Sequence, residues 1–373
     1  RKTTMKRLIA LFLAAALALS LAACGGNGGN PATGSGDGSS QGSGQSTPVS
    51  SQEPLKYVFI HSASLGSQSF ADVVDKGLKE AAAAFGAEYS IIENVETSAV
   101  ADTLRTVIAS GSHLVIIAVN TWNDPLMEVA KEYPDFPFAV LDADGTGVLS
   151  QSCSNIYEVS YREHESAFLN GVFCALMSKT GKIAQLQGSD GGTMVRFNSG
   201  FRAGGKYVLG EDPSTTVVGF TDVNKGYETA MLYYNQGYDW LACCAAGSNL
   251  GAFQASQEAG GDKYICGAAD GQFHLMPDRI VCSQVKTIDK VGYQYIQGIV
   301  ENGDFKGGKW DVLGAQEGGV DLIFNEGNAE LMAMIPDETM AEYQKIRSAV
   351  MSGEITVPAT PEELDSFTQR YQK

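Results

Sequence analysis

Basic residues are scarce in this sequence. Lysine and arginine together number 26 against 43 aspartates and glutamates, which leaves a formal net charge of −17 at pH 7. Binding to a nucleic-acid polymer, or docking to an anionic membrane surface, requires clusters of lysine and arginine. The charge therefore argues against both kinds of partner, and the self-repulsion that it causes favours a monomer.

The sequence also lacks the common signatures of catalysis and metal binding. From residue 55 onward there is no Gly-x-Ser-x-Gly, no Walker loop and no Gly-x-Gly-x-x-Gly placed between a strand and a helix. Cys-x-x-Cys is absent, and the four histidines are scattered without the spacing of zinc ligands. These absences predict that the protein is not an enzyme and uses no cofactor or metal ion.

The apolar run near the N-terminus is too short for a membrane-spanning helix. It covers residues 8–23, which is 16 residues, whereas a span needs about 20. A basic start, this run and the small residues before Cys24 together predict a secretory signal peptide. The ending Leu21-Ala22-Ala23-Cys24 resembles the bacterial lipobox. That resemblance implies a lipoprotein signal peptide over residues 1–24, a lipid on Cys24, and a position on the extracytoplasmic face of the cell membrane.

The segment after Cys24 has almost no apolar residues. Residues 25–54 are nearly all Gly, Ser, Asn, Gln, Thr, Pro and Asp. Such a composition cannot bury enough surface to offset the entropy of ordering, so we expect a disordered tether. About 320 residues remain, which is more than one hydrophobic core usually serves, and two lobes are therefore expected.

Six cysteines follow Cys24. An even number outside the cytoplasm is compatible with disulfides. Most of them, however, lie inside apolar runs, and neighbours such as Cys243 and Cys244 point to opposite faces of a strand. We therefore favour buried free thiols that pack as small hydrophobic groups, with disulfides as the alternative.

Strand-like and helical patterns alternate from residue 55 onward. The expected strands are 56–60, 89–92, 113–119, 138–141, 156–160, 182–186, 216–220, 240–245, 264–267 and 279–285. The expected helices are 70–81, 99–110, 125–132, 163–178, 195–208, 227–235, 252–259 and 289–301, with a further helix at 338–351. This alternation predicts an α/β protein with parallel sheets and helices on both faces. Ligands of such sheets bind beyond the carboxyl ends of the strands.

Several segments resemble one family. They are residues 155–165, 168–183, 195–204, 283–286 and 318–322. Together they are similar to the basic membrane protein family of solute-binding lipoproteins, whose best-known members bind purine nucleosides for ABC importers. The resemblance extends over residues 57–324.

The resemblance implies a type I periplasmic-binding-protein fold, in which two doubly wound Rossmann-like lobes are joined by a three-strand hinge. Lobe one would comprise residues 55–158 and 288–315, and lobe two residues 159–287 and 316–373. The implied function is a lipid-anchored receptor that passes a nucleoside-like molecule, foremost a purine nucleoside, to an ABC permease after hinge closure. A surface sensor that signals without transport, a receptor for another metabolite and a nucleoside hydrolase are the alternatives.

The resemblance also implies where the ligand binds. Ser69 and Phe70 match the family's first loop, where the aromatic residue stacks on the base. Lys286 matches a lysine that contacts ribose hydroxyls, and Asp142 matches the acid that ends the fourth strand. The chain departs from the family pattern at three positions, where Ser67, Ala71 and Ala269 replace polar or acidic residues.

Five further residues complete the expected site. Gly247 and Asp270 lie in loops similar to two ligand loops of the family, and Trp122 stands near a family aromatic. Tyr161 and Phe197 are expected to line the cleft. Each assignment has a structural alternative, because aromatic side chains also build cores and aspartates also stabilise turns.

Overall fold

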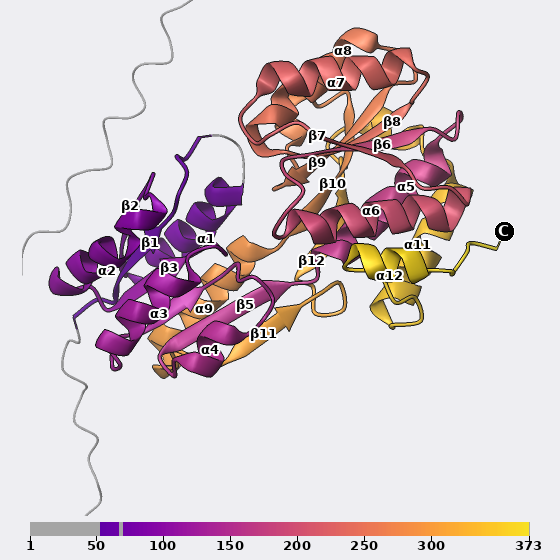
Figure 1. The fold of residues 1–373 in the computed structure, drawn as a ribbon. Coiled ribbons are helices and arrows are strands. Elements are labelled where there is room, and N and C mark those ends of the chain that lie inside the picture. The colour runs from indigo at the N-terminus through magenta and orange to yellow at the C-terminus, as the bar shows by residue number, and fades with distance from the viewer. Residues whose placement is uncertain (1–52, 67–69, 373) are drawn as a thin grey trace, which may run out of the picture. The chain divides into compact units, whose positions relative to one another are not determined.

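The computed structural model describes residues 53–66 and 70–372, and these residues form two six-stranded sheets (Figure 1). The first sheet has the order β11-β5-β4-β3-β1-β2, and its neighbouring strands all pair in parallel. Its strands are β1 (Lys56–Ile60), β2 (Glu88–Ile92), β3 (Leu114–Ile117), β4 (Phe138–Val140), β5 (Ile156–Tyr161) and β11 (Trp310–Leu313). We call this sheet and its helices lobe one.

The second sheet has the order β12-β10-β9-β8-β6-β7 and defines lobe two. Its pairs are parallel except for β10 with β12, which run antiparallel. The strands are β6 (Ile183–Gln187), β7 (Ser214–Val217), β8 (Trp240–Cys244), β9 (Tyr264–Ala269), β10 (Ile280–Lys286) and β12 (Val320–Phe324). The α/β class and the two doubly wound lobes are thus confirmed.

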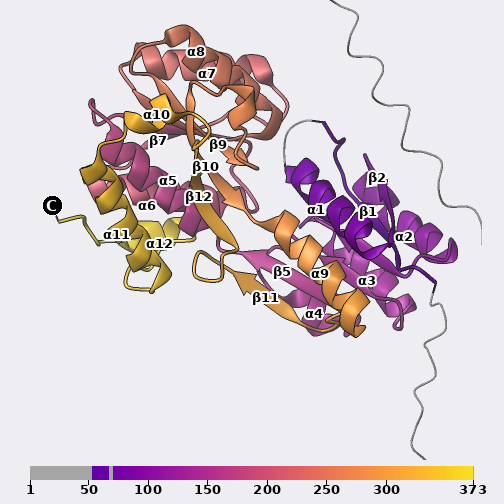
Figure 2. The ribbon, with the colours of Figure 1, turned by 180° about the vertical axis from the view of Figure 1, so that it is seen from behind.

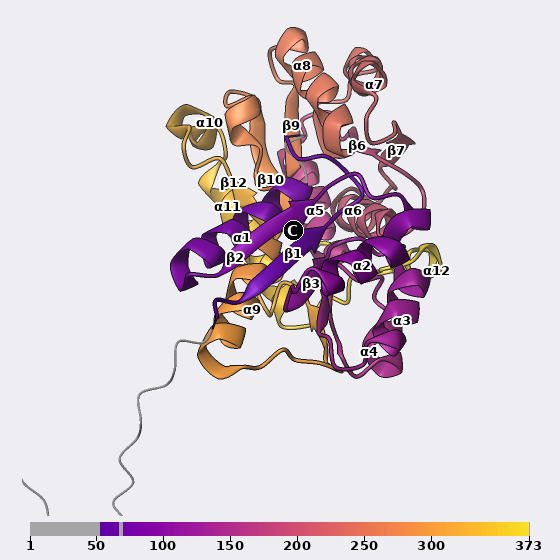
Figure 3. The same ribbon diagram turned by 90° about the vertical axis from the view of Figure 1, so that its left-hand side faces the viewer.

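Helices cover both faces of each sheet, as alternating strands and helices require. In lobe one, α2 (Val100–Ala109), α3 (Asn123–Glu132) and α4 (Val148–Ser152) pack on one face, and α1 (Phe70–Phe85) and α9 (Ile288–Asn302) on the other (Figure 3). In lobe two, α7 (Val223–Asn235) and α8 (Asn249–Ala259) pack on one face, and α5 (Glu163–Met177) and α6 (Met194–Leu209) on the other.

The chain passes between the sheets three times. The crossings follow β5, follow β10, and join β11 to β12. Strand β5 stays in the first sheet up to Tyr161, so the expected lobe boundary at residues 158 and 159 falls inside this strand. These three connections link the two lobes side by side at one edge of the interface, which is the arrangement found in proteins that close by a hinge.

The C-terminal segment packs on lobe two, as Figure 2 shows from behind. It contains α10 (Ala329–Ala333), α11 (Asp337–Met351) and α12 (Pro361–Ser366). Helix α11 contacts α5, and α12 contacts α6. The expected helix at 338–351 is therefore confirmed, and its apolar side joins the core of lobe two through Tyr343, Ile346 and Val350.

One expected strand was misplaced, and several short elements were missed. The strand expected at 216–220 lies at 214–217, because residues 218–222 leave the sheet as a loop after β7. Strand β11 and helices α4, α10 and α12 were not predicted.

All six cysteines from Cys153 onward are free and buried, in agreement with their expected role in packing. Within residues 53–66 and 70–372, no helix is both long and apolar enough to span a bilayer.

Candidate functional site

A cavity of about 410 Å³ lies between the lobes, at the carboxyl ends of strands from both sheets. Lobe one contributes residues that follow β1, begin α1 or follow β4: His61, Ser62, Ala63, Phe70, Ala71, Val73 and Asp142. Lobe two and the hinge contribute Thr193, Met194, Phe197, Phe220, Cys244, Ala245, Ala246, Asn249, Ala268, Ala269, Gln272, Gln284, Lys286 and Ile288. Apolar and aromatic side chains with a few polar groups are typical of a small-molecule site.

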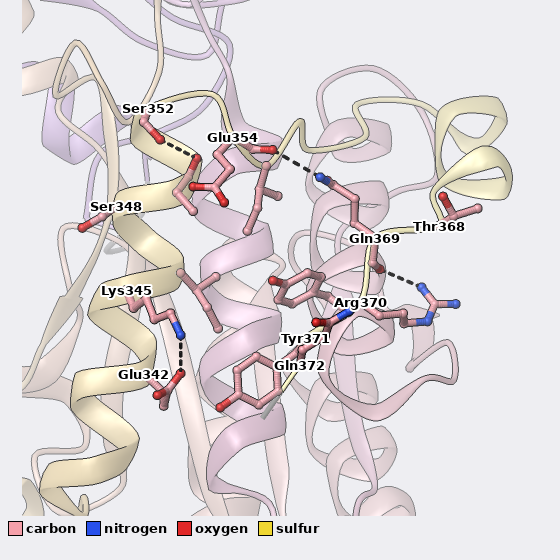
Figure 4. Close-up of a pocket in the computed structure, with 14 residues that line it drawn as sticks. Glu342, Lys345, Ser348, Ser352, Glu354, Thr368, Gln369, Arg370, Tyr371 and Gln372 are labelled. Carbon is pink, nitrogen blue, oxygen red and sulfur yellow. Dashed lines mark hydrogen bonds and ion pairs between the residues drawn. The ribbon is translucent and has the colours of Figure 1, made fainter.

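A larger groove of about 1120 Å³ lies on lobe two beside the C-terminal segment (Figure 4). Its walls come from the C-terminal half of α11, the following turn and residues 368–372, with Tyr207 from α6. Lys345 and Glu342 form an ion pair along one side, and Gln369 donates to the carbonyl oxygen of Glu354 across it. None of the expected site residues that the structure describes lies in this groove, so the interlobe cavity is the candidate site.

Two aromatic rings enter the cavity from opposite lobes. Phe70 begins α1 in lobe one, and Phe197 belongs to the first turn of α6 in lobe two. The Lys286 ammonium lies 4.8 Å from the centre of the Phe70 ring and 5.9 Å from the centre of the Phe197 ring. Aromatic faces on two sides of a cavity suit a planar ligand.

The charged groups beside the cavity pair with one another. Lys286 Nζ lies 2.7 Å from Asp142 Oδ1 and 3.3 Å from Glu163 Oε1. Arg196 donates from Nε to Glu163 Oε2 at 2.6 Å and from Nη1 to the Asp144 carbonyl oxygen at 3.0 Å. These contacts join lobe two to lobe one across the hinge.

The pKa values follow from this pairing. Burial disfavours the charged form of Glu163, but Lys286 and Arg196 outweigh that effect and hold the pKa of Glu163 below its usual value. Burial also disfavours the ammonium of Lys286, but Asp142 and Glu163 outweigh it and raise the pKa of Lys286. The positive charge of Lys286 is thus balanced by carboxylates of the protein. The same ion pair balances the negative charge of Asp142, the only carboxylate among the described residues that line the cavity.

Two neutral polar side chains in the wall have unused hydrogen-bonding groups. Gln284 is 2% exposed; its Oε1 accepts a bond of 3.4 Å from Asn170, and its Nε2 has no partner among the described residues. His61 is 8% exposed, and its Nδ1 accepts a bond of 3.0 Å from the Ala63 N–H. Buried polar groups are normally paired, so these groups point to a ligand.

The structure brings four of the expected site residues to the cavity: Phe70, Asp142, Phe197 and Lys286. Tyr161 lies just behind them. Its ring centre is 5.4 Å from Lys286 Nζ, but the side chain is 2% exposed and does not line the cavity. Gly247 is next to the wall residue Ala246.

The other expected residues lie elsewhere. Trp122 is 1% exposed, packs in the core of lobe one with α3 and does not line the cavity. Asp270 is exposed, and its carboxylate accepts from the Gln272 N–H within a turn, so Gln272 rather than Asp270 reaches the cavity. Ser69 and Cys24 lie outside the described residues.

Several residues of the site were missed from the sequence. Glu163 and Arg196 organise the charges, and His61, Gln272 and Gln284 supply polar groups to the wall. A histidine directly after an apolar strand, at the carboxyl end of a parallel sheet, was the available signal for His61. Nothing in the sequence marked Gln284, because it lies inside a predicted strand, between Ser283 and Val285.

Comparison with known proteins places this arrangement in context. A family of ABC transporter substrate-binding proteins described as PnrA-like matches residues 55–361. Basic membrane protein D of Borreliella burgdorferi is 32% identical over 66% of this chain and 71% of its own length. Basic membrane protein A of the same species is 27% identical over 85% of this chain and 91% of its own length.

Solved structures share the fold. A solute-binding protein of an ABC transporter system from Aeropyrum pernix K1 has a TM-score of 0.74 at 23% identity, covering 84% of this chain and 96% of that chain. Another from Conexibacter woesei has a TM-score of 0.66 at 22% identity, covering 82% of this chain and 99% of that chain. At these identities the likeness concerns the fold alone.

Proposed function

The chain belongs to the family of PnrA-like ABC transporter substrate-binding proteins, and from this premise we propose that it is a lipid-anchored, extracytoplasmic receptor for a nucleoside-like molecule. The ligand binds in the interlobe cavity and is delivered to an ABC permease. A purine nucleoside is the foremost candidate. The lipid on Cys24 is proposed from the lipobox-like ending of residues 21–24, which lie outside the described part of the chain.

One observation carries the ligand class: Phe70 and Phe197 approach the same cavity from different lobes. A planar ring held between them contacts both lobes, so it binds the closed arrangement better than an open one. Such a difference in affinity is what drives hinge closure. Two of the polar groups that the family pattern would supply are absent, because Ala71 and Ala269 line the wall instead.

The charge balance of the cavity supports an uncharged ligand. Asp142 is already paired with Lys286, so a cation would have to displace the ammonium and an anion would have to displace the carboxylate. A neutral nucleoside needs neither exchange. Its polar groups can instead form hydrogen bonds with neutral side chains of the wall such as Gln284 and His61, because a few polar groups usually orient a ligand in an apolar pocket.

Calorimetric titration tests the proposal. Residues 53–373 form one compact unit and are the form to use. We expect one nucleoside among adenosine, guanosine, inosine and uridine to bind at one site per chain, with micromolar or tighter affinity and without turnover. Binding only to free ribose, or to none of the panel, would overturn the nucleoside assignment. Hydrolysis of the bound nucleoside would overturn the assignment as a receptor.

A further inference from the structure

His61 is held firmly in the wall that lobe one contributes. Its backbone N–H donates to the Ile92 carbonyl at 3.0 Å, and its own carbonyl accepts from the Val95 N–H at 3.1 Å. The residue therefore extends the pairing of β1 with β2 beyond the end of the strand. The ring centre lies 5.6 Å from that of Phe59 and 6.4 Å from that of Phe70. The orientation of the imidazole is therefore determined by the sheet and by two aromatic neighbours.

The hydrogen bond from Ala63 determines which ring nitrogen of His61 carries the proton. Because Nδ1 accepts from the Ala63 N–H at 3.0 Å, it has no proton, and in the neutral ring the proton is on Nε2. Burial lowers the pKa of His61 and outweighs the opposing effect of the Asp72 charge, which keeps the ring neutral at neutral pH.

The remaining donor, Nε2–H, has no protein partner among the described residues. Within residues 53–66 and 70–372, no side chain or carbonyl group accepts a hydrogen bond from Nε2–H of His61. The side chain is more than nine-tenths buried and lines the cavity, and Nε2 lies on the side of the ring opposite to Nδ1. A donor in the wall of a largely enclosed cavity is poorly solvated, so a ligand group that accepts from it gains affinity.

Building on the proposed function, we infer that His61 determines specificity by donating from Nε2–H to an acceptor on the ligand ring, which is a ring nitrogen or a ring carbonyl oxygen. A ligand that turns an N–H toward His61 meets a second donor and is rejected, because sites built to pair one group discriminate strongly against another.

His61→Asn and His61→Asp form a matched pair that tests this role. Both side chains are similar in size, and both keep an oxygen that can accept from the Ala63 N–H. The second polar atom of the side chain then faces the cavity: it is an N–H donor in asparagine and a second acceptor oxygen in aspartate. The probes are adenosine with its 1-deaza, 3-deaza and 7-deaza analogues, and inosine with purine riboside, which lacks the carbonyl oxygen.

We expect the wild-type protein to bind one analogue about 10- to 100-fold more weakly than its parent nucleoside, as the loss of one buried hydrogen bond predicts. His61→Asn should retain the affinity for the parent within about threefold. His61→Asp should bind the parent about 10- to 100-fold more weakly and should no longer distinguish the parent from that analogue. The loss of discrimination, rather than the loss of affinity alone, identifies His61 as the contact.

The other outcomes are separable. Equal affinity of the wild type and His61→Asp for every probe overturns the role of His61 and leaves the nucleoside receptor intact. Absence of binding by the wild type to any nucleoside overturns the proposed function, and the inference falls with it. Nitrogen-15 NMR of the histidine rings in the unliganded wild type is independent of folding defects in the variants: a proton on Nδ1 rather than Nε2 of His61 overturns the inference.

Discussion

The Lys286 ammonium lies 2.7 Å from a carboxylate oxygen of Asp142, and this ion pair joins the two lobes at the wall of the cavity. Lys286 ends β10 of the second sheet, and Asp142 follows β4 of the first sheet. Their side chains are only 11% and 9% exposed. Breaking a buried ion pair is costly, because the charge that remains is left in a poorly solvating environment.

Lys286→Met removes the cation and leaves Asp142 unpaired. We expect the free energy of unfolding, measured with urea, to fall by about 3–5 kcal/mol. Lys290→Met is the control, because Lys290 is exposed on α9, and it should change stability by no more than about 0.5 kcal/mol. Adding Asp142→Asn to Lys286→Met should recover part of the loss. Equal effects of the two lysine variants would show that the ion pair does not join the lobes in solution.

Gly204→Ala tests the contact between α5 and α6. A Cβ atom at Gly204 would overlap the carbonyl oxygen of Phe168, and this clash cannot be relieved by turning a side chain. We expect a loss of about 2–4 kcal/mol in the free energy of unfolding, because overpacking here forces the helix backbones apart. The control is Gly298→Ala in α9, where the new methyl group meets no atom within 4 Å. It should stabilise the protein by up to about 1 kcal/mol.

The fold could be predicted closely from the sequence because it depends on patterns that are local. Apolar strands such as 56–60 and helices with apolar positions three or four residues apart were recognisable without knowledge of their partners. The missed strand β11 shows the limit. Its burial alternates between exposed and half-buried positions, so its four residues have no continuous apolar run and depend on pairing with β5.

The site was less predictable, because it depends on the direction of side chains. Phe70 and Trp122 both follow strands of the same sheet, yet one faces the cavity and the other the core. Glu163 was recognisable only as the start of a helix, and its contacts with Lys286 and Arg196 join residues far apart in the sequence. Such tertiary contacts leave no spacing pattern in a single sequence.

The imidazole of His164 on α5 makes stability depend on pH. Its Nδ1 is buried without a partner, and burial lowers the pKa of His164 to about 4 from 6.5. Above pH 6.5 the ring is neutral in both states. As the pH falls below 6.5, the unfolded chain binds a proton that the folded chain does not, so stability is lost until the pH reaches about 4.

We therefore expect His164 to account for a loss of about 2 kcal/mol in the free energy of unfolding between about pH 7.5 and about pH 5. The measurement is urea unfolding of the wild type and His164→Gln at both values. The variant should lose less stability than the wild type over this interval. An identical loss in both proteins would show that His164 is protonated with its ordinary pKa in the folded state.

Trp122→Phe separates packing from ligand binding. Because Trp122 is 1% exposed in the core of lobe one, we expect a loss of about 1–2 kcal/mol in the free energy of unfolding. Calorimetry should show nucleoside affinity within about twofold of the wild type. A tenfold loss of affinity at unchanged stability would instead place the indole in contact with the ligand, as the sequence had suggested.

Phe220 is the most exposed of the three aromatic side chains that line the cavity. It lies in the loop after β7, is 45% exposed, and its ring packs directly over Gly188 at the end of β6, where a Cβ atom would overlap it. Covering an exposed apolar ring at a cavity with a ligand removes apolar surface from water and so favours binding.

Phe220→Ala should therefore weaken nucleoside binding by roughly tenfold and change the free energy of unfolding by no more than about 0.5 kcal/mol. Leu232→Ala, on a 56% exposed residue of α7 outside the cavity, is the matched control and should leave affinity unchanged. Equal affinities of these two variants would mean that the ligand is enclosed by Phe70 and Phe197 without a third ring.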